Sequence, residues 1–281
     1  MTKIALSVTT CRRPMPFKRA WNSFKLHCLD THLIDKYYVV DDFSPKDDLR
    51  HMKKTAPEAT FLTKKPHEKG HAGSLNVILR ELYEKDFDYL IFLEDDFFFI
   101  KDDNYITKCI DLLKKYDELS QVVFNKNYHE TNTFFENDRV VLSGEEIRNE
   151  KGELECLRHE WKGFVNSDGW KSFMSQHPGK VSHAHWFGFT LNPGIWNLKK
   201  IKHVGYFTPS DSFEWFFAER CWIQGYRTAF LPDVNCIHLG KLRPSMKEVP
   251  DQVNAMYDRY GINMNTLGSG TSAYDLNSTK R

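Results

Sequence analysis

The sequence predicts an α/β fold in which a mostly parallel sheet is flanked by helices. In the first half of the chain, short apolar runs alternate with segments of helical periodicity. These units recur about every 25–35 residues, which is the spacing of strand–helix–strand units rather than of hairpins. One run, Tyr89–Leu93, is apolar at every position, as is typical of a strand that is buried on both faces of a sheet.

Each expected strand is a short run rich in β-branched and aromatic residues. The second run ends in two aspartates, and the fourth continues directly into an acidic triplet. Runs of this length and composition indicate strands rather than helices. Strands are therefore predicted at residues 3–10, 37–42, 59–63, 89–93 and 121–124.

Helix signals lie between these strands. Pro14 and Pro16 favour a helix start, as does Ser44-Pro45 after the second strand. A later segment places Leu75, Ile78 and Leu82 on one apolar helical face. Helices are predicted at residues 14–29, from residue 45 onward, at 73–83 and at 102–115.

The pattern changes after about residue 125. Residues 126–182 are polar, with a hairpin signal at Asn149–Gly152, and a second apolar block spans residues 183–238. A polar tail follows. We therefore expect one part at residues 1–125, a second at 126–245 and a tail at 246–281.

The charge balance argues against a nucleic-acid binder. Lys and Arg total 39 and Asp and Glu total 38, so the formal net charge is +1. A nucleic-acid-binding surface normally needs a clear basic excess or stripe, so no nucleic-acid partner is expected.

The cysteines and the apolar runs favour a soluble, cytoplasmic protein. The six cysteines include no C-x-x-C pair, and we expect reduced thiols. The apolar run at the N-terminus is too short for a signal peptide. No run reaches 18 apolar residues, so no integral membrane segment is expected.

Polar side chains follow three of the predicted strands at their carboxyl ends. They are Thr9-Thr10, Asp41-Asp42 and Glu94-Asp95-Asp96. Ligands of open parallel sheets bind beyond this edge, so we expect the three clusters to form one site. Hard carboxylate oxygens suit a divalent cation, although a solvated acidic turn or a helix cap is the alternative for the triplet.

Four segments, in order, resemble the GT-A superfamily of glycosyltransferases, and most nearly its large family two. The segment Val8-Thr9-Thr10 is similar to the first nucleotide contact of the family. Val39–Ser44 resembles its V-V-D-D-x-S motif, and Gly70–Asn76 its glycine-bearing loop. Leu93–Asp96 is similar to the D-x-D metal motif, with glutamate in place of the first aspartate.

The resemblance implies a GT-A, Rossmann-like fold and a nucleotide-sugar site. Residues 1–125 would bind the nucleotide sugar and 126–245 the acceptor. A divalent cation, Mn²⁺ or Mg²⁺, would be held by Glu94, Asp95, Asp96 and the late histidine His238, for which a buried strand histidine is the alternative. The implied donor contacts are Thr9, Thr10, Arg12, Asp41, Asp42, His71, Asn76, Asp95 and Trp186.

The second half resembles the family less closely. Phe213-Glu214, Arg220 and Gly225–Arg227 stand at the spacings of the family's E-D…R…G-Y-R pattern. Glu214 then occupies the position of the catalytic base. Because Phe213 replaces an acid of that pattern, Asp211 and Glu219 remain alternatives for the base.

The resemblance predicts a metal-dependent glycosyltransferase, a hexosyl- or pentosyltransferase. It would move a sugar from a UDP-sugar to a hydroxyl of a glycan or glycoconjugate acceptor, with inversion. Trp186 is expected to stack on a sugar, with core packing as the alternative. Two other functions stay open: a sugar-phosphate nucleotidylyltransferase, which normally carries G-x-G-T-R where this chain has Thr9–Pro14, and a non-catalytic glycan-binding module.

Overall fold

The computed structural model describes residues 2–126 and 140–239, and the predicted tail at 246–281 lies outside them. The first half alternates strands and helices as expected: β1 (Ile4–Thr10), α1 (Pro14–His27), β2 (Lys36–Asp41), α2 (Lys46–Thr55), β3 (Thr60–Leu62), α3 (His71–Glu84), β4 (Tyr89–Glu94), α4 (Tyr105–Lys115) and β6 (Leu119–Val123). Short 3₁₀ turns lie at Thr31–Leu33 and Pro66–Glu68. The predicted boundaries agree with these to within about three residues.

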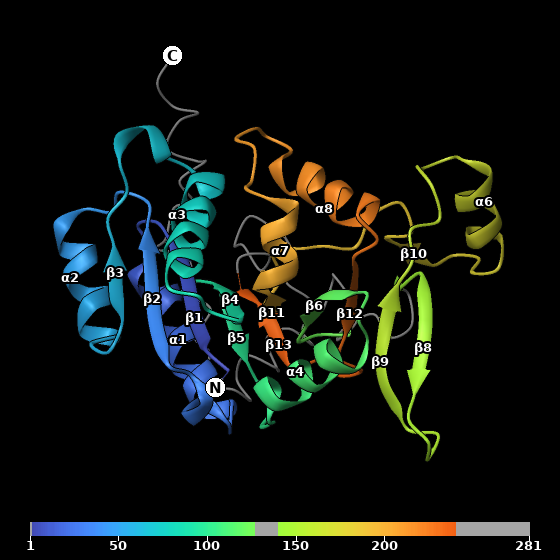
Figure 1. Cartoon of the computed structure of the whole chain (residues 1–281), viewed down its shortest axis with the longest axis horizontal. Coiled ribbons are helices and arrows are strands. Elements are labelled where there is room, and N and C mark those ends of the chain that lie inside the picture. Colours follow the sequence, from blue (N-terminus) through green and yellow to red (C-terminus); the bar gives the residue numbers. More distant parts are fainter. Residues whose placement is uncertain (1, 127–139, 240–281) are drawn as a thin grey trace.

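One nine-stranded sheet crosses the molecule in the order β3-β2-β1-β4-β11-β6-β12-β9-β8 (Figure 1). The strands β1 to β4 are mutually parallel. The second half of the chain supplies β8 (Gly144–Arg148), β9 (Leu154–His159), β11 (Gly194–Asn197) and β12 (Arg227–Phe230). β11 lies antiparallel between β4 and β6, so the two predicted parts share one sheet.

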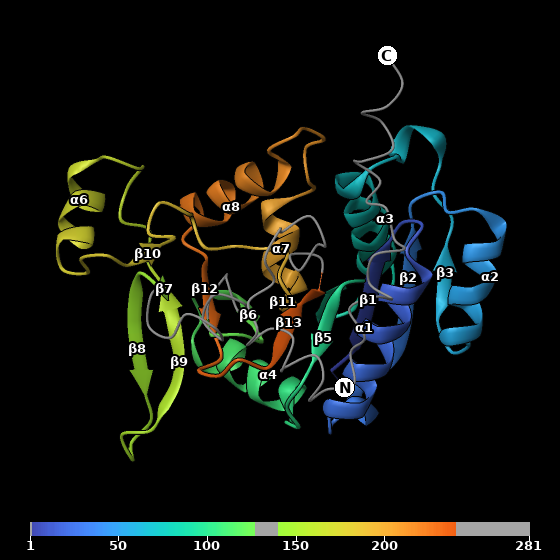
Figure 2. The same ribbon diagram turned by 180° about the vertical axis from the view of Figure 1, so that it is seen from behind.

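Helices cover both faces of this sheet (Figures 1 and 2). Alternate residues of β1 face opposite layers. Leu6 and Val8 pack in one apolar cluster with α1 and α4, whereas Ala5 packs in the other with α3. That second layer also holds α7 (Leu198–Val204) and α8 (Phe213–Ile223). The predicted fold class, a mostly parallel sheet between helices, is thereby observed.

Smaller elements complete the second half. The hairpin predicted at Asn149–Gly152 joins β8 to β9. The remaining elements are α6 (Asp168–Ser175), β5 (Phe97–Phe99), β13 (Cys236–His238), β7 (Val140–Val141) and β10 (Val181–Ser182). In the described part of the chain, no helix is both long and apolar enough to cross a membrane. The six cysteines all lie in this part and form no disulfide.

Candidate active site

The acidic triplet lies at the carboxyl end of β4, where it meets the segment that follows β1. Thr10 donates a hydrogen bond from Oγ1 to Asp95 Oδ2 at 2.7 Å. Arg13 forms ion pairs with both aspartates, from Nη1 to Asp95 Oδ1 at 2.9 Å and from Nη2 to Asp96 Oδ2 at 2.8 Å. Both carboxylates are almost fully buried. The β1 segment therefore fixes the orientation of the triplet.

His238 reaches the triplet through a second, two-stranded sheet. β13 pairs antiparallel with β5, in a register that sets His238 opposite Phe97. Their rings stack with centroids 4.5 Å apart. Since Phe97 directly follows Asp96, the pairing brings His238 Nε2 to 3.1 Å from Asp96 Oδ2.

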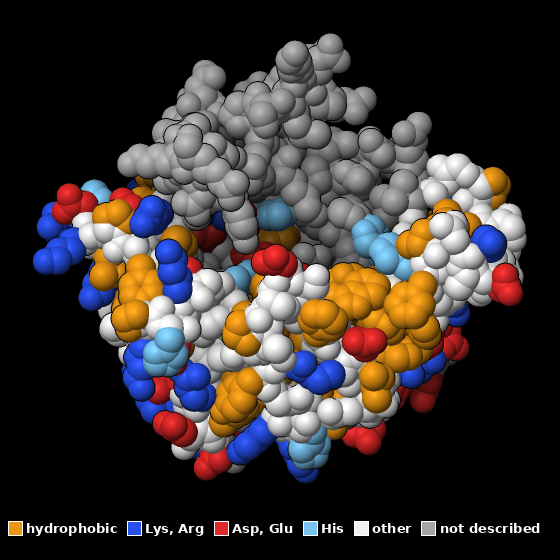
Figure 3. Space-filling model, turned by 90° about the horizontal axis from the view of Figure 1, so that it is seen from above, with side chains coloured by type: hydrophobic (Ala, Val, Ile, Leu, Met, Phe, Trp, Pro, Cys, Tyr) orange, Lys and Arg blue, Asp and Glu red, His pale blue; other side chains and the backbone are white. Residues whose placement is uncertain are grey.

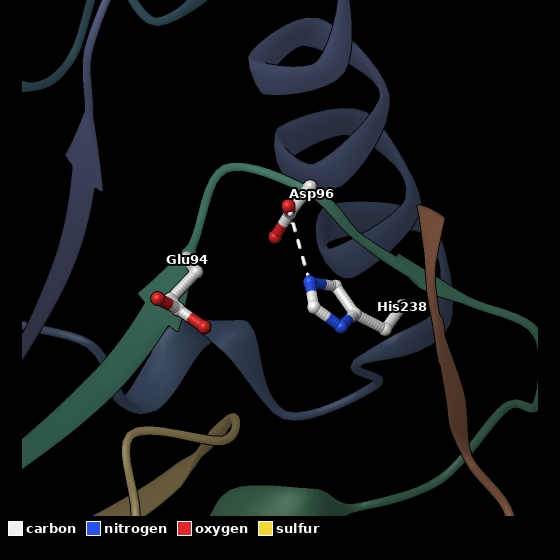
Figure 4. A group of neighbouring side chains, drawn as sticks. All are labelled: Glu94, Asp96 and His238. Carbon is white, nitrogen blue, oxygen red and sulfur yellow. Dashed lines mark ion pairs between the residues drawn. The ribbon is translucent and has the colours of Figure 1, made fainter. Parts of the chain in front are cut away.

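Three of the predicted metal-site residues form one group. Glu94, Asp96 and His238 each offer a ligand atom, and these atoms lie within 4.8 Å of one another. Figure 4 shows their side chains converging from β4, from the turn after it and from β13. The two carboxylates supply the hard oxygen donors that Mn²⁺ and Mg²⁺ prefer, and the imidazole is a common metal ligand. Asp95, the fourth predicted ligand, instead bonds to Thr10 and Arg13.

The electrostatics of this group favour a cation. Burial, and then the charges of Asp96, Glu214 and Asp95, raise the pKa of Glu94. Burial also opposes ionisation of Asp96, but His238 and Arg13 outweigh it and lower the pKa of that carboxyl. Asp96 is almost fully buried, whereas the side chain of Glu94 is 26 % exposed. A divalent cation would relieve the mutual repulsion of these carboxylates.

His71, at the start of α3, joins the first strand to the acidic turn. Its Nε2 lies 3.4 Å from Thr9 Oγ1 and 3.7 Å from Glu94 Oε1. Burial and the charge of Lys64 lower the pKa of His71 to about 4. The imidazole is therefore neutral near pH 7 and is available as a hydrogen-bonding group.

Asp41 and Asp42 have different environments. Asp41, at the end of β2, accepts hydrogen bonds from the backbone amide and the hydroxyl of Ser44. The hydroxyl of Ser44 also accepts a bond from the backbone amide of Arg12. Arg12 and Phe43 both have positive φ angles, 55° and 58°. Two strained residues on facing loops are typical of a functional site.

Asp42 is bonded to Lys64, whose side chain is 0 % exposed. Lys64 Nζ donates to Asp42 Oδ1 at 2.6 Å, and the backbone amide of Gly70 donates to the same carboxylate. Lys64 also bonds to the Gly70 carbonyl and to Ser74 Oγ. Asp42 is therefore the counter-ion of a buried lysine that ties β2 to the start of α3.

Asn76 is engaged by the backbone of a distant residue. Its Nδ2 donates to the Phe207 carbonyl and its Oδ1 accepts from the Phe207 amide, both at 2.8 Å. Both polar atoms of the amide thereby hold the 205–212 loop against α3. Its expected donor contact stays a prediction.

Glu214 lies in the first turn of α8 and accepts two hydrogen bonds on Oε1. One comes from the backbone amide of Leu191 at 2.8 Å and the other from Thr190 Oγ1 at 3.1 Å. After burial and the charge of Asp96, the charge of Glu214 also raises the pKa of Glu94. Asp211 is exposed in the loop before α8 and Glu219 is half-buried along this helix.

A sequence comparison assigns the family. Residues 7–182, more than half of the chain, match the family model described as Glycosyl transferase family 2. The chain belongs to glycosyl transferase family 2. The family resemblance that the sequence motifs indicated is thereby confirmed. In a comparison with curated protein sequences, no significant match to this chain is found.

Solved structures share the fold of this family 2 member. The mannosyltransferase PcManGT from Pyrobaculum calidifontis, in complex with GDP-Man and Mn²⁺, has a TM-score of 0.54 and 14 % identity over 84 % of this chain. S. aureus TarS 1–349, in complex with UDP-GlcNAc, has a TM-score of 0.51 and 14 % identity over 83 %. The chain spans 56 % of each of those two proteins. The predicted GT-A fold is confirmed.

Trp186 lies in an aromatic layer with Trp215, the residue that follows Glu214 in α8. Its Nε1 donates to the Phe189 carbonyl at 2.8 Å, and its ring meets the Trp215 ring edge-on at 5.2 Å. Trp215 in turn stacks on Phe164, which is 53 % exposed. Figure 3 shows apolar side chains gathered over α8 and beside histidines. Stacking of Trp186 on a sugar stays a prediction.

The sequence motifs of this family 2 member did not reveal Arg13, Lys64 or Thr190. Arg13 stands next to Arg12, and nothing in the linear order shows which of the two side chains turns toward the acidic triplet. Lys64 belongs to a pair of consecutive lysines, a pattern that is typical of a solvent-exposed surface. Thr190 contacts Glu214 only through the fold.

Proposed function

We propose that this family 2 glycosyltransferase moves a sugar from a nucleotide-diphosphate donor to a hydroxyl of a glycan or glycoconjugate acceptor. A UDP-sugar is the favoured donor. The single observation that carries the proposal is the group of Glu94, Asp96 and His238, with ligand atoms within 4.8 Å. It lies at the strand ends where ligands of open parallel sheets bind. The two solved relatives, bound to GDP-Man with Mn²⁺ and to UDP-GlcNAc, support a nucleotide sugar.

The donor would lie along the ends of β1, β2 and β4. Asp41 would accept a hydrogen bond from the base, next to the Arg12–Ser44 contact. Thr9 and His71 border Glu94 and would face the diphosphate end. Asp96, Glu94 and His238 would hold Mn²⁺ or Mg²⁺. Such a metal, when bound, stabilises negative charge on the leaving diphosphate.

Glu214 is proposed as the base. Its carboxylate would accept the proton of the acceptor hydroxyl while the hydroxyl oxygen attacks the anomeric carbon. The bond from that carbon to the diphosphate oxygen breaks, and attack opposite the leaving group inverts the configuration. The hydrogen bonds from Leu191 and Thr190 hold Glu214 Oε1 and fix the direction of the carboxylate. A positioned base contributes about 10²–10⁴ in rate.

The acceptor would lie over the second part of the chain, residues 126–245. Trp186 bonds to the Phe189 carbonyl, and its ring contacts the ring of Trp215, the residue that follows Glu214 in α8. Flat aromatic faces there would support the apolar face of an acceptor sugar. Substrate screening with hexose and pentose donors then identifies the donor sugar.

Ligand-dependent thermal unfolding tests the proposal. The protein is heated with UDP, GDP or TDP, each with and without Mn²⁺. Stabilisation by a ligand grows with the ratio of its concentration to its dissociation constant. We expect the largest rise in Tm with UDP and Mn²⁺ together, and UDP-sugar hydrolysis or transfer under the same conditions. Equal Tm values in all samples would contradict the proposal, and binding without turnover would favour a non-catalytic module.

A further inference from the structure

The guanidinium of Arg13 forms ion pairs with both aspartates of the acidic turn, Asp95 and Asp96. Arg13 is the residue just before Pro14, the first residue of α1, so its backbone is anchored by the helix. Its two Nη atoms contact separate carboxylates, at 2.9 Å to Asp95 and at 2.8 Å to Asp96. Both carboxylate side chains are under 10 % exposed, and that of Arg13 is 28 % exposed. The family motifs described above assign no role to this arginine.

The contact with Asp96 falls on an oxygen that also faces His238. Asp96 Oδ2 lies 2.8 Å from Arg13 Nη2 and 3.1 Å from His238 Nε2. Asp96 and His238 are two of the three residues that can hold a metal. A guanidinium stays charged at every relevant pH. The acidic turn therefore contains a cation of its own, bonded to a ligand of the metal site.

Resting on the metal role proposed above, we propose that Arg13 is the resident counter-cation of the acidic turn and keeps the affinity of the nucleotide-free site for a divalent cation low. The metal then binds together with the donor diphosphate and not before it. At an effective dielectric constant of about 20, a unit charge a few Å from the metal changes binding by more than tenfold. The diphosphate supplies negative charge that offsets this repulsion.

Alternatively, the two ion pairs of Arg13 serve merely to orient the carboxylates. The counter-cation role and this orienting role predict opposite effects of a neutral replacement on metal affinity. An arginine that merely orders Asp96 improves the metal site, so a neutral replacement would weaken metal binding. A counter-cation occupies the carboxylate, so a neutral replacement strengthens metal binding in the absence of nucleotide. A lysine keeps the charge without the two Nη contacts and separates the charge from the geometry.

Direct titration of Mn²⁺ into the full chain without nucleotide, by calorimetry and by electron paramagnetic resonance of free Mn²⁺, tests the proposal. We expect Arg13→Gln to bind Mn²⁺ at least tenfold more tightly than the unchanged protein. Arg13→Lys should stay close to the unchanged protein. The matched control is Arg80→Gln, which removes another ion-paired arginine, the partner of Glu68, and should leave Mn²⁺ binding unchanged.

A second titration at saturating UDP completes the test. At saturating UDP, the increase in Mn²⁺ affinity caused by Arg13→Gln should be smaller, because in the unchanged protein the diphosphate offsets the guanidinium charge. Weaker or unchanged Mn²⁺ binding by Arg13→Gln without UDP would overturn the proposal. If Arg13→Gln does not fold, Arg13→Met, which is also neutral and keeps an aliphatic stem, replaces it. Failure of the unchanged protein to bind Mn²⁺ even with UDP would instead overturn the proposed metal role itself.

Discussion

The carboxylate of Glu214 and the backbone amide of Leu191 are joined by a hydrogen bond of 2.8 Å. The two residues are 23 positions apart, and the bond crosses from α8 to the segment that leads into β11. This backbone donor persists through any substitution of Leu191 other than proline, and it helps to hold the carboxylate in one orientation. This suits a base, because proton transfer requires a fixed direction toward the acceptor hydroxyl.

The first prediction concerns Glu214→Gln. The amide keeps the size of the side chain and an oxygen that can accept from Leu191, but it cannot take up a proton. We expect the turnover number to fall by about 10² or more, whereas the Kd for UDP with Mn²⁺ stays nearly unchanged. Steady-state rates at saturating donor and calorimetric UDP binding measure the two effects.

The control for this prediction is Asp211→Asn. Asp211 is exposed in the loop before α8 and is the nearest rival for the base. The turnover numbers of the Asp211→Asn and Glu219→Gln variants should change little. A collapse with Asp211→Asn together with a mild effect of Glu214→Gln would move the base to Asp211.

The second prediction concerns Asp96→Asn. Asp96 contacts both His238 and Arg13, and it belongs to the metal-ligand group. The neutral amide is a poorer ligand for a divalent cation. Mn²⁺-dependent UDP binding, measured by calorimetry, should be lost while circular dichroism shows a folded protein. Asp233→Asn, at an exposed ion pair with Lys101, is the control and should bind normally.

Sequence motifs predicted much of this site, and the reasons are physical. The end of a strand is visible in the sequence as a change from apolar to polar residues. Because the carboxyl ends of parallel strands meet at one edge of the sheet, Thr10, Asp41 and Glu94 could be placed together there. The position of β11 could not be predicted, because apolar periodicity does not tell strand direction. Nor could the choice between Arg12 and Arg13, which depends on the positive φ of Arg12 that turns the chain.

The third prediction separates Asp41, the last residue of β2, from its neighbour Asp42. Asp42→Ala would leave the ammonium of Lys64, which is 0 % exposed, without its carboxylate. Loss of one partner of a buried ion pair costs about 3–5 kcal/mol in the free energy of unfolding. Asp41→Ala should instead weaken UDP binding by about 1–3 kcal/mol. Urea unfolding measures the stability of both variants, and calorimetry measures their UDP affinity. If the two variants have equal effects on stability and on UDP affinity, the assignment of a structural role to Asp42 and a base contact to Asp41 is contradicted.

The fourth prediction concerns pH and His159. The His159 side chain is buried, and burial lowers its pKa from 6.5 to about 4 although its ring nitrogen Nε2 bonds to the Trp186 carbonyl. Between these two pH values the unfolded chain takes up a proton that the folded protein does not. This histidine therefore lowers stability as pH falls from 6.5 to 4, by at most about 3 kcal/mol.

Glutamine at this position can still donate to the Trp186 carbonyl but does not titrate. We expect His159→Gln to lose less stability than the unchanged protein when urea unfolding at pH 7 is compared with that at pH 5. The control is His51→Gln, a change at an exposed position of α2. Identical pH dependence in all three proteins would show that His159 is protonated in the fold as readily as in the unfolded chain.

The fifth prediction sets a structural role of Asn76 against a donor contact. Family resemblance assigns Asn76 to the donor, yet both polar atoms of its amide bond to the backbone of Phe207, 131 residues away. Asn76→Ala leaves the Phe207 amide and carbonyl without these partners, and each unpaired group costs about 1–3 kcal/mol. Asn76→Asp keeps the acceptor but turns a carboxylate oxygen toward the Phe207 carbonyl, so it should also destabilise. We expect both variants to lower the free energy of unfolding and to leave the Kd for UDP with Mn²⁺ nearly unchanged. Weaker UDP binding at unchanged stability would show instead that Asn76 serves the donor and that its bonds to Phe207 give way when the nucleotide binds.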